Sequence, residues 1–147
     1  MGRPQTNIRN AARGAFQKVR RDHAQETAED YVEAIEQIRL RLGACRVADL
    51  ARLMQVSHVT VVKIISRLVA AELVRKTPYG PIELTRAGAS MARAARLRHD
   101  DVVGFLRAIG VTEPHASLDA EGMEHHLSPV TVAAMRRFLR SRARTPR

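Results

Sequence analysis

Two carboxylates and an imidazole stand at helical spacing near the end of the chain. Glu121, Glu124 and His125 occupy positions i, i+3 and i+4, which share one face of an α-helix and can converge on one ion. Carboxylate oxygen and imidazole nitrogen are both ligands of divalent metals, although a solvated polar face is the alternative for this segment alone. His126 is rotated by about 100° from His125, so we expect it to pack or hydrogen-bond elsewhere.

A second acidic pair lies far upstream. Asp30 and Glu33 are three residues apart near the start of a predicted helix, where the helix dipole alone already favours acidic side chains. His99 taken alone is an ordinary surface or core histidine. These residues join a metal site only if the fold brings them to the downstream cluster, so the elements that carry them decide the chemistry.

The composition favours a soluble protein built from packed helices. Of the 147 residues, 45% are hydrophobic, only 3% are aromatic and none is tryptophan, so aliphatic side chains must form the core. The single cysteine, Cys45, excludes an intrachain disulfide and a thiolate zinc knuckle. No apolar run reaches the ~18 residues of a membrane span, and MGRPQTNIRN lacks the apolar stretch of a secretory signal. We therefore expect a cytoplasmic protein without a membrane partner.

The net charge of +10 favours a polyanionic partner and is concentrated in the two tails. Residues 1–25 hold six basic side chains and one acid, and residues 136–147 hold six arginines and no acid. The segment between them is nearly neutral, with 13 basic and 14 acidic residues. Basic tails are either solvated ends or phosphate contacts, so charge alone does not identify a DNA-binding protein.

The chain is expected to open with a mobile basic arm over residues 1–25, although its segment AARGAFQKVRRDHAQ could instead form a helix that extends the next element. A first amphipathic helix then follows over 27–42, with Thr27 as its cap and Gly43 as its end. Its inward-facing apolar positions, three and four residues apart, are Tyr31, Ile35, Ile38 and Leu42.

The next segments predict a winged helix-turn-helix domain over residues 26–85. Two short helices, RVADLARLMQV and SHVTVVKIISRLVAAEL, are joined by a tight break at Val56 and Ser57, and Ser57 is the expected N-cap of the second. The extended runs VRKT and PIELT flank the turn residues PYG and predict a two-stranded hairpin. Helix, helix-turn-helix and hairpin in this order describe a winged helix.

Residues 86–147 predict an all-helical second domain. A helix rich in alanine is expected to start at Thr85, to bend or break near Gly104 and to end at Gly110. Another helix runs through EGMEHH, and a last one opens at Ser128 and Pro129. The predicted fold class is therefore mainly α with a small β-hairpin wing.

The start of the second helix in the helix-turn-helix is expected to enter the major groove of DNA. His58 and Thr60 are the expected base readers, and Val59 either contacts a thymine methyl group or is buried. The remaining basic residues and the hairpin are expected to meet phosphate. The complete set of predicted DNA contacts is Ser57, His58, Val59, Thr60, Lys63, Arg67, Lys76 and Tyr79.

Four motifs in a fixed order resemble the manganese-responsive branch of the diphtheria toxin repressor family: DYVEAI, VSHVTVVKIISRL, the RH before FLRAIGV, and DAEGMEHHLS. The resemblance covers roughly residues 26–140. It implies a winged helix followed by a helical metal-binding and dimerisation domain, without the additional C-terminal domain of longer relatives. It also implies metal ligation by Asp30, Glu33, His99, Glu121, Glu124 and His125, with Glu33 and Glu124 suited to bridge two ions.

The branch assignment depends on two positions, because iron-responsive relatives have methionine at the place of Asp30 and cysteine at that of Glu121. Hard oxygen ligands suit Mn²⁺, up to two ions per subunit, although Fe²⁺, Co²⁺ or Zn²⁺ can substitute. The resemblance implies a homodimeric repressor of metal-homeostasis genes that binds double-stranded operator DNA with Mn²⁺ as corepressor.

Three alternatives stay open at this point: an Fe²⁺-responsive repressor of the same family, an architectural DNA-binding protein and a dinuclear metal hydrolase or oxidase. The sequence lacks an HExxH pattern, a nucleophile motif and a phosphate loop, which makes the enzyme the weakest of them.

Overall fold

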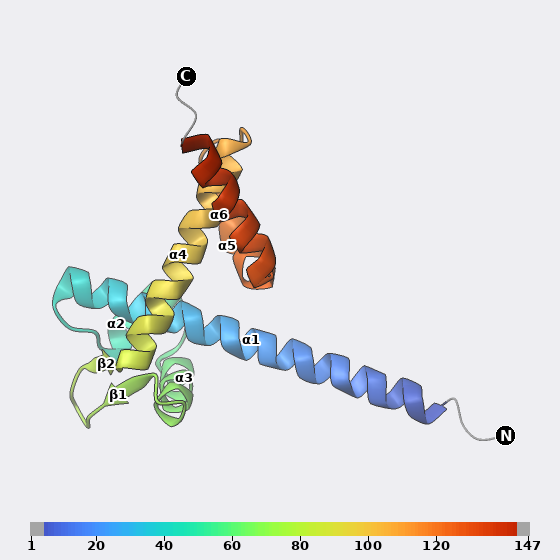
Figure 1. Cartoon of the computed structure of the whole chain (residues 1–147). Coiled ribbons are helices and arrows are strands. Elements are labelled where there is room, and N and C mark those ends of the chain that lie inside the picture. Colours follow the sequence, from blue (N-terminus) through green and yellow to red (C-terminus); the bar gives the residue numbers. More distant parts are fainter. Residues whose placement is uncertain (1–4, 144–147) are drawn as a thin grey trace. The chain divides into compact units, whose positions relative to one another are not determined.

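The computed structural model describes residues 5–143 and divides the chain into two compact units, residues 1–89 and 90–147 (Figure 1). Of the two basic tails, residues 1–4 and 144–147 lie outside the described part. Among the described helices, none is by itself long and apolar enough to cross a membrane. The helices α2 (Val47–Met54) and α3 (His58–Ala70), bent by 111°, reach that length and composition only as a pair.

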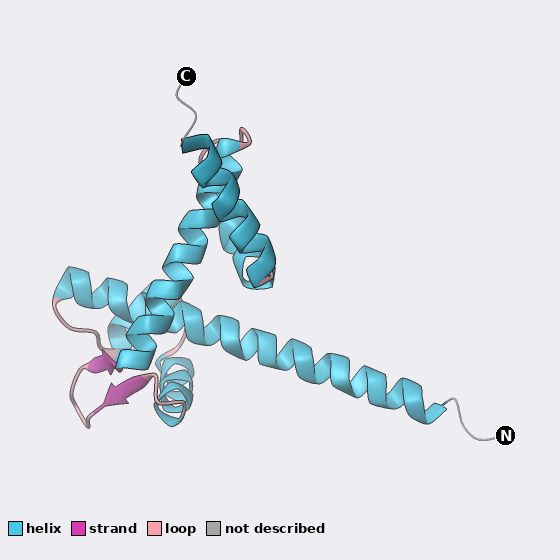
Figure 2. Cartoon of the chain, in the orientation of Figure 1, coloured by secondary structure: helices cyan, strands magenta, loops and turns pink. Residues whose placement is uncertain are grey.

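The first unit contains three helices and the hairpin. It is built from α1 (Gln5–Leu42), α2 (Val47–Met54), α3 (His58–Ala70), β1 (Val74–Lys76) and β2 (Ile82–Leu84), shown by secondary structure in Figure 2. The strands are antiparallel with Val74 opposite Leu84. Cys45 adds a third backbone segment, because its carbonyl accepts a hydrogen bond from the amide of Ile82 at 2.8 Å. The predicted helix-turn-helix and hairpin are confirmed.

The core of this unit follows the predicted helical stripes. Tyr31, Ile35 and Ile38 of α1 are buried together with apolar residues of α2, α3 and both strands. Leu42 is exposed, contrary to expectation, because it is the last residue of α1 and the chain turns away at Gly43. Gly43 has φ of 81°, a left-handed conformation that glycine adopts without a Cβ penalty.

Helix α1 is much longer than predicted, beginning at Gln5 rather than Thr27. Thr27 does not cap it, because its hydroxyl donates back to the carbonyl of His23, one helical turn earlier. The segment between these two residues contains Ala, Arg, Gln and Lys, which are good helix formers, and no proline lies between Pro4 and the end of α1 at Leu42. The helix therefore includes most of the segment that was predicted to be a mobile arm.

The second unit is entirely helical where it is described. It comprises α4 (Arg86–Ala108), which begins in the first unit, α5 (His115–Met123), the 3₁₀ turn η1 (Glu124–His126) and α6 (Pro129–Ala143). Its core is apolar, centred on Val102, Ala116, Ala120 and Met135. Phe105 of α4 and Phe138 of α6 meet edge to face, with ring centroids 5.4 Å apart.

Two expectations for this unit are corrected. Helix α4 continues without interruption through Gly104, whose added Cβ would lie 3.3 Å from Leu139 Cδ1, so this glycine serves close packing of α4 against α6. The EGMEHH helix ends at Met123 and continues as a 3₁₀ turn, because the chain must leave the α conformation before Ser128 and Pro129 open α6. Termination of α4 near Gly110 and the cap at Ser128 are confirmed.

Candidate metal centre and DNA-binding surface

Three side chains from three consecutive elements converge inside the second unit. His99 of α4, Glu121 of α5 and Glu124 of η1 each offer a ligand atom within 4.8 Å of the others. His99 Nδ1 lies 2.6 Å from Glu124 Oε2 and 3.8 Å from Glu121 Oε2. His99 is 25 residues from Glu124 in sequence, so only the packing of α4 against the later elements unites them.

Glu124 is the buried member of this cluster, with 2% of its side chain exposed. Burial raises the pKa of its carboxyl, because desolvation penalises the charged form, and Glu121 adds repulsion. The hydrogen bond and charge of His99 and the charge of His125 act in the opposite direction, toward a lower pKa. Glu121 is 71% exposed and closes the cluster on the solvent side.

His125 lies beside the cluster and contacts it from the interior. Its Nε2 is 3.6 Å from Glu124 Oε1, and its side chain is almost entirely buried. The adjacent His126 is exposed, as the rotation between consecutive residues predicts. The sequence predicted that Glu124 and His125 share one α-helical face with Glu121. They lie instead in a 3₁₀ turn, which winds more tightly than an α-helix.

Asp30 and Glu33 lie three residues apart on α1, each half-buried, in the other unit. Both have interaction partners in the structure. Their participation in a common site with the cluster of the second unit stays a prediction.

The donor set in the second unit fits a divalent cation. Two carboxylates and an imidazole are ligands that Mn²⁺ and similar ions accept, and their ligand atoms already lie close together. Burying a carboxylate such as Glu124 is costly unless a positive charge compensates it. A bound cation would remove that cost, so the residues present suit the metal that the sequence motifs imply.

The exposed face of α3 carries most of the predicted DNA contacts. Val59 is 64% exposed, which decides against the buried alternative, and His58 and Lys63 are exposed beside it. Ser57 caps the helix, because its Oγ accepts the amide hydrogen of Thr60 at 3.1 Å. The hydroxyl of Thr60 lies 2.9 Å from Ser57 Oγ, so it belongs to the cap as well.

The DNA contacts predicted from the sequence do not include Val62, which is exposed one turn after Val59 on the same face of α3. The helical period was the signal that could have found it. Arg67 is exposed further along this helix, and Lys76 and Tyr79 are exposed on the hairpin. The surface thus combines apolar, hydroxyl and basic groups.

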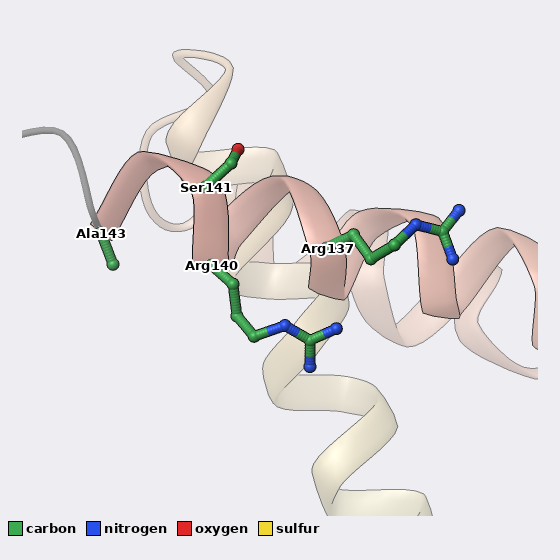
Figure 3. Close-up of a pocket in the computed structure, with 4 residues that line it drawn as sticks. All are labelled: Arg137, Arg140, Ser141 and Ala143. Carbon is green, nitrogen blue, oxygen red and sulfur yellow. The ribbon is translucent and has the colours of Figure 1, made fainter.

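Two other surface features do not form comparable sites. A hollow of about 690 Å³ lies along α6 and is lined by Arg137, Arg140, Ser141 and Ala143 (Figure 3). All four residues come from one helix, and the Ser141 side chain points away from the side on which Arg140 projects. A groove of about 420 Å³ lies between the end of α1 and α2.

Comparison with known proteins matches both parts of the chain. Residues 23–82 match the domain described as iron dependent repressor, N-terminal DNA binding domain. Residues 85–147 match the domain described as iron dependent repressor, metal binding and dimerisation domain. The two matches follow the order of the two structural units.

Individual relatives agree with these domain matches. The transcriptional regulator MntR of Escherichia coli O6:H1 is 40% identical over 123 residues, which cover 84% of this chain and 79% of that protein. The HTH-type transcriptional regulator MntR of Bacillus subtilis strain 168 is 36% identical over 100 residues, covering 68% and 70%.

Among solved structures, the manganese regulator SloR superposes with a TM-score of 0.66 at 27% identity. The match covers 77% of this chain and 53% of SloR, so the chain spans about half the length of that relative. Both family domains match in order along the chain, and a transcriptional regulator is 40% identical to it. The chain therefore belongs to the iron-dependent repressor family, also called the diphtheria toxin repressor family, as an MntR-like member.

Proposed function

We propose that this protein is a manganese-dependent transcriptional repressor that binds operator DNA as a homodimer when its metal site is filled. The observation that carries the proposal is the buried carboxylate of Glu124 beside His99 and Glu121. A matching DNA-binding domain over residues 23–82 supports the nucleic-acid part, and a solved relative described as a manganese regulator supports the choice of ion.

The proposed ligand set joins residues of both units. Its members are Asp30, Glu33, His99, Glu121, Glu124 and His125, with Glu33 and Glu124 as bridging carboxylates if two ions bind. When bound, the metal supplies positive charge that neutralises carboxylates which otherwise repel one another. Oxygen at the positions of Asp30 and Glu121 favours Mn²⁺ over softer ions.

Through these ligands, metal binding would affect DNA binding by fixing the position of α1. Asp30 and Glu33 belong to the helix that forms the core of the DNA-binding unit, whereas the other ligands belong to the second unit. Holding the two groups of carboxylates together restricts the arrangements available to two recognition helices in a dimer. Metal and DNA then increase each other's affinity by the same factor.

The DNA surface proposed here comprises a reading part and a backbone part. His58 and Val59 are the base contacts, and Thr60 contributes chiefly by closing the cap with Ser57. Phosphate contacts come from Lys63, Arg67, Lys76 and Tyr79.

The decisive experiment compares Glu124→Gln with His126→Gln. We expect the Glu124 variant to bind Mn²⁺ at least about tenfold more weakly and to lose Mn²⁺-dependent DNA binding, because the amide cannot supply the buried negative charge. The variant at exposed His126 should resemble the parent. Binding of Mn²⁺ is followed by calorimetry, and DNA binding by anisotropy of a duplex selected from a randomised pool with Mn²⁺ present.

Four outcomes would redirect the proposal. A parent protein that selects no duplex sequence is not a repressor of this kind. Stronger activation by Fe²⁺ than by Mn²⁺ at equal free concentration would favour the iron-responsive alternative, and DNA binding unaffected by metal removal would favour an architectural protein. If Glu124→Gln responds to Mn²⁺ like the parent, the ligand set is wrong.

A further inference from the structure

The arginines of α6 fall into two groups with different surroundings. The first group fastens α6 to α4. Arg136 Nε donates to Asp101 Oδ2 at 2.9 Å, and Arg142 Nη1 donates to the carbonyl of Ala108. The Arg142 guanidinium also lies over the Phe138 ring, 5.8 Å from its centroid. These two arginines therefore serve the packing of the second unit.

The second group is the α6 arginine pair, Arg137 and Arg140, which is exposed to solvent (Figure 3). The two residues are three apart on one side of the helix and line the hollow of about 690 Å³ together with Ser141 and Ala143. Within the described residues, neither guanidinium makes a hydrogen bond or an ion pair. The Ser141 hydroxyl donates to the Phe138 carbonyl at 2.8 Å. The guanidinium groups are therefore the donors that a ligand of this hollow would meet.

The chemistry of the α6 arginine pair suits the phosphates of a nucleic acid. Each planar guanidinium can make paired hydrogen bonds to one phosphate. Their Cβ atoms are about 5–6 Å apart at this spacing, so the long side chains can reach separate phosphates of one strand. The other residues of the hollow are small, whereas protein interfaces rely on aromatic or large apolar anchors. An open face along one helix also suits an extended polyanion.

We propose that the α6 arginine pair binds the backbone of a second DNA duplex, without reading its sequence, while the winged helix holds the operator. This inference rests on the proposed function, since it adds a second duplex to the operator complex. The pair belongs to the second unit, whereas the proposed operator contacts belong to the first.

The number of arginines is sufficient for such a contact in a dimer. Arg144 and Arg147 follow the pair in the sequence, which gives four arginines per chain and therefore eight per dimer. Sequence-independent binding to DNA typically has a Kd of roughly 10⁻⁴–10⁻⁶ M at physiological salt, and about six to ten phosphate contacts make it steeply salt-dependent. The operator complex also has base contacts, so the second duplex should dissociate first as salt is raised.

The test uses the full-length protein with Mn²⁺ and the selected duplex fixed to a sensor surface. A second duplex of unrelated sequence is then passed over the complex, and its binding is measured against its concentration. The parent should bind this duplex at about 50 mM salt and release it by about 200 mM. Arg137→Gln with Arg140→Gln should weaken this binding at least about tenfold and lower the salt slope of log K by about 2 for each engaged chain.

The matched control replaces Arg93 and Arg107, two exposed arginines of α4 in the same unit, by glutamine. It removes an equal charge and should bind the second duplex within about twofold of the parent. Both double variants should bind the selected duplex like the parent. Their melting temperatures should also stay unchanged, because glutamine is a good helix former at an exposed position.

The outcomes separate this inference from the proposed function. A parent that binds the selected duplex but no second duplex would overturn the inference alone. Equal binding of the second duplex by the parent and by the variant of the α6 arginine pair would assign the bridging to a second winged helix. Displacement of the second duplex by polyglutamate, but not by unlabelled duplex, would indicate an acidic protein partner and overturn the DNA assignment. A parent that binds no selected duplex in Mn²⁺ would overturn both.

Discussion

At the scale of single residues, Glu124 concentrates the chemistry of the second unit. It is buried, its carboxyl lies 2.6 Å from His99 Nδ1, and burial raises its pKa. Cys45 shows the opposite use of burial: desolvation and the nearby Asp49 raise its pKa to about 12, so the thiol serves packing beneath the hairpin. Burial therefore prepares one titratable group for a cation and makes another inert.

The raised pKa of Glu124 predicts a pH-dependent stability in metal-free protein. The folded state holds this proton at pH values where the unfolded chain has lost it. The contribution of the protonated carboxyl to the free energy of unfolding is therefore complete at low pH, and it is lost as pH rises through the pKa of the folded state. In EDTA, the melting temperature of the parent should fall over this range relative to Glu124→Gln. Saturating Mn²⁺ should reverse the trend, because the ion binds the carboxylate. Parallel melting curves for parent and variant at all pH values would contradict this.

At the scale of elements, the exposed face of α3 carries the side chains that we propose for base reading and for phosphate contact. Val59 and Val62 are exposed one turn apart, and Lys63 follows them. The Ser57 and Thr60 hydroxyls close the first turn of the helix instead of extending from it. Apolar exposed groups at the start of a recognition helix suit the methyl group of thymine.

Two substitutions in α3 should separate these roles. Lys63→Ala should weaken binding to all duplexes similarly and reduce the salt slope by about 1. Val59→Ala should instead change the base preferred at one position of the selected sequence, with little effect on the slope. Sequence selection repeated with each variant provides the measurement. Equal loss of Mn²⁺ affinity in both variants would show misfolding and contradict the assignment of the two roles.

Two glycines test the packing of neighbouring elements. Gly88→Ala should destabilise the first unit by about 1–3 kcal/mol, because the new Cβ would lie 2.0 Å from the Leu73 carbonyl oxygen, a backbone atom that cannot move freely. Gly122→Ala in α5 meets nothing within 4 Å and should stabilise its helix by roughly 0.5–1 kcal/mol. Thermal unfolding measures both. The two substitutions should change the free energy of unfolding in opposite directions. Destabilisation by Gly122→Ala would contradict an exposed helical position at this residue of α5.

At the scale of the whole molecule, charge and apolar surface are distributed differently over the chain. Basic residues dominate both ends of the sequence, where solvated tails and contact with phosphate are the two alternatives. The second unit exposes Leu118 at 65% and Val130 at 76%, large apolar side chains on α5 and α6. The domain match of this unit includes dimerisation, so these residues are candidates for a two-fold interface.

The dimer prediction is tested by charge substitution with a control of similar exposure. The parent should scatter light as twice 16.4 kDa, and Leu118→Glu with Val130→Glu should shift it toward the monomer, because two carboxylates would then be buried at the interface. Leu42→Glu, at an equally exposed site in the first unit, should remain dimeric. A monomeric parent that binds DNA tightly would defeat the prediction, since one small winged helix offers limited contact area.

The sequence by itself determined the features that depend on neighbours within a few residues. The cap at Ser57 and the left-handed glycines at Gly43 and Gly110 follow from local backbone chemistry. The buried stripes of the helices follow from the 3.6-residue period, and the hairpin follows from turn residues between two extended runs. The family resemblance came from the order of such short motifs.

Tertiary structure alone decided the features that join distant segments. The contact between His99 and Glu124, the position of Arg46 at the carbonyl of Tyr79, and the packing role of Gly104 each link elements more than 20 residues apart. No local pattern encodes such contacts, because they arise when helices pack through their buried faces. The same reason explains why the burial of Glu124, and with it the raised pKa of its carboxyl, was invisible in the sequence: desolvation is a property of the surrounding fold.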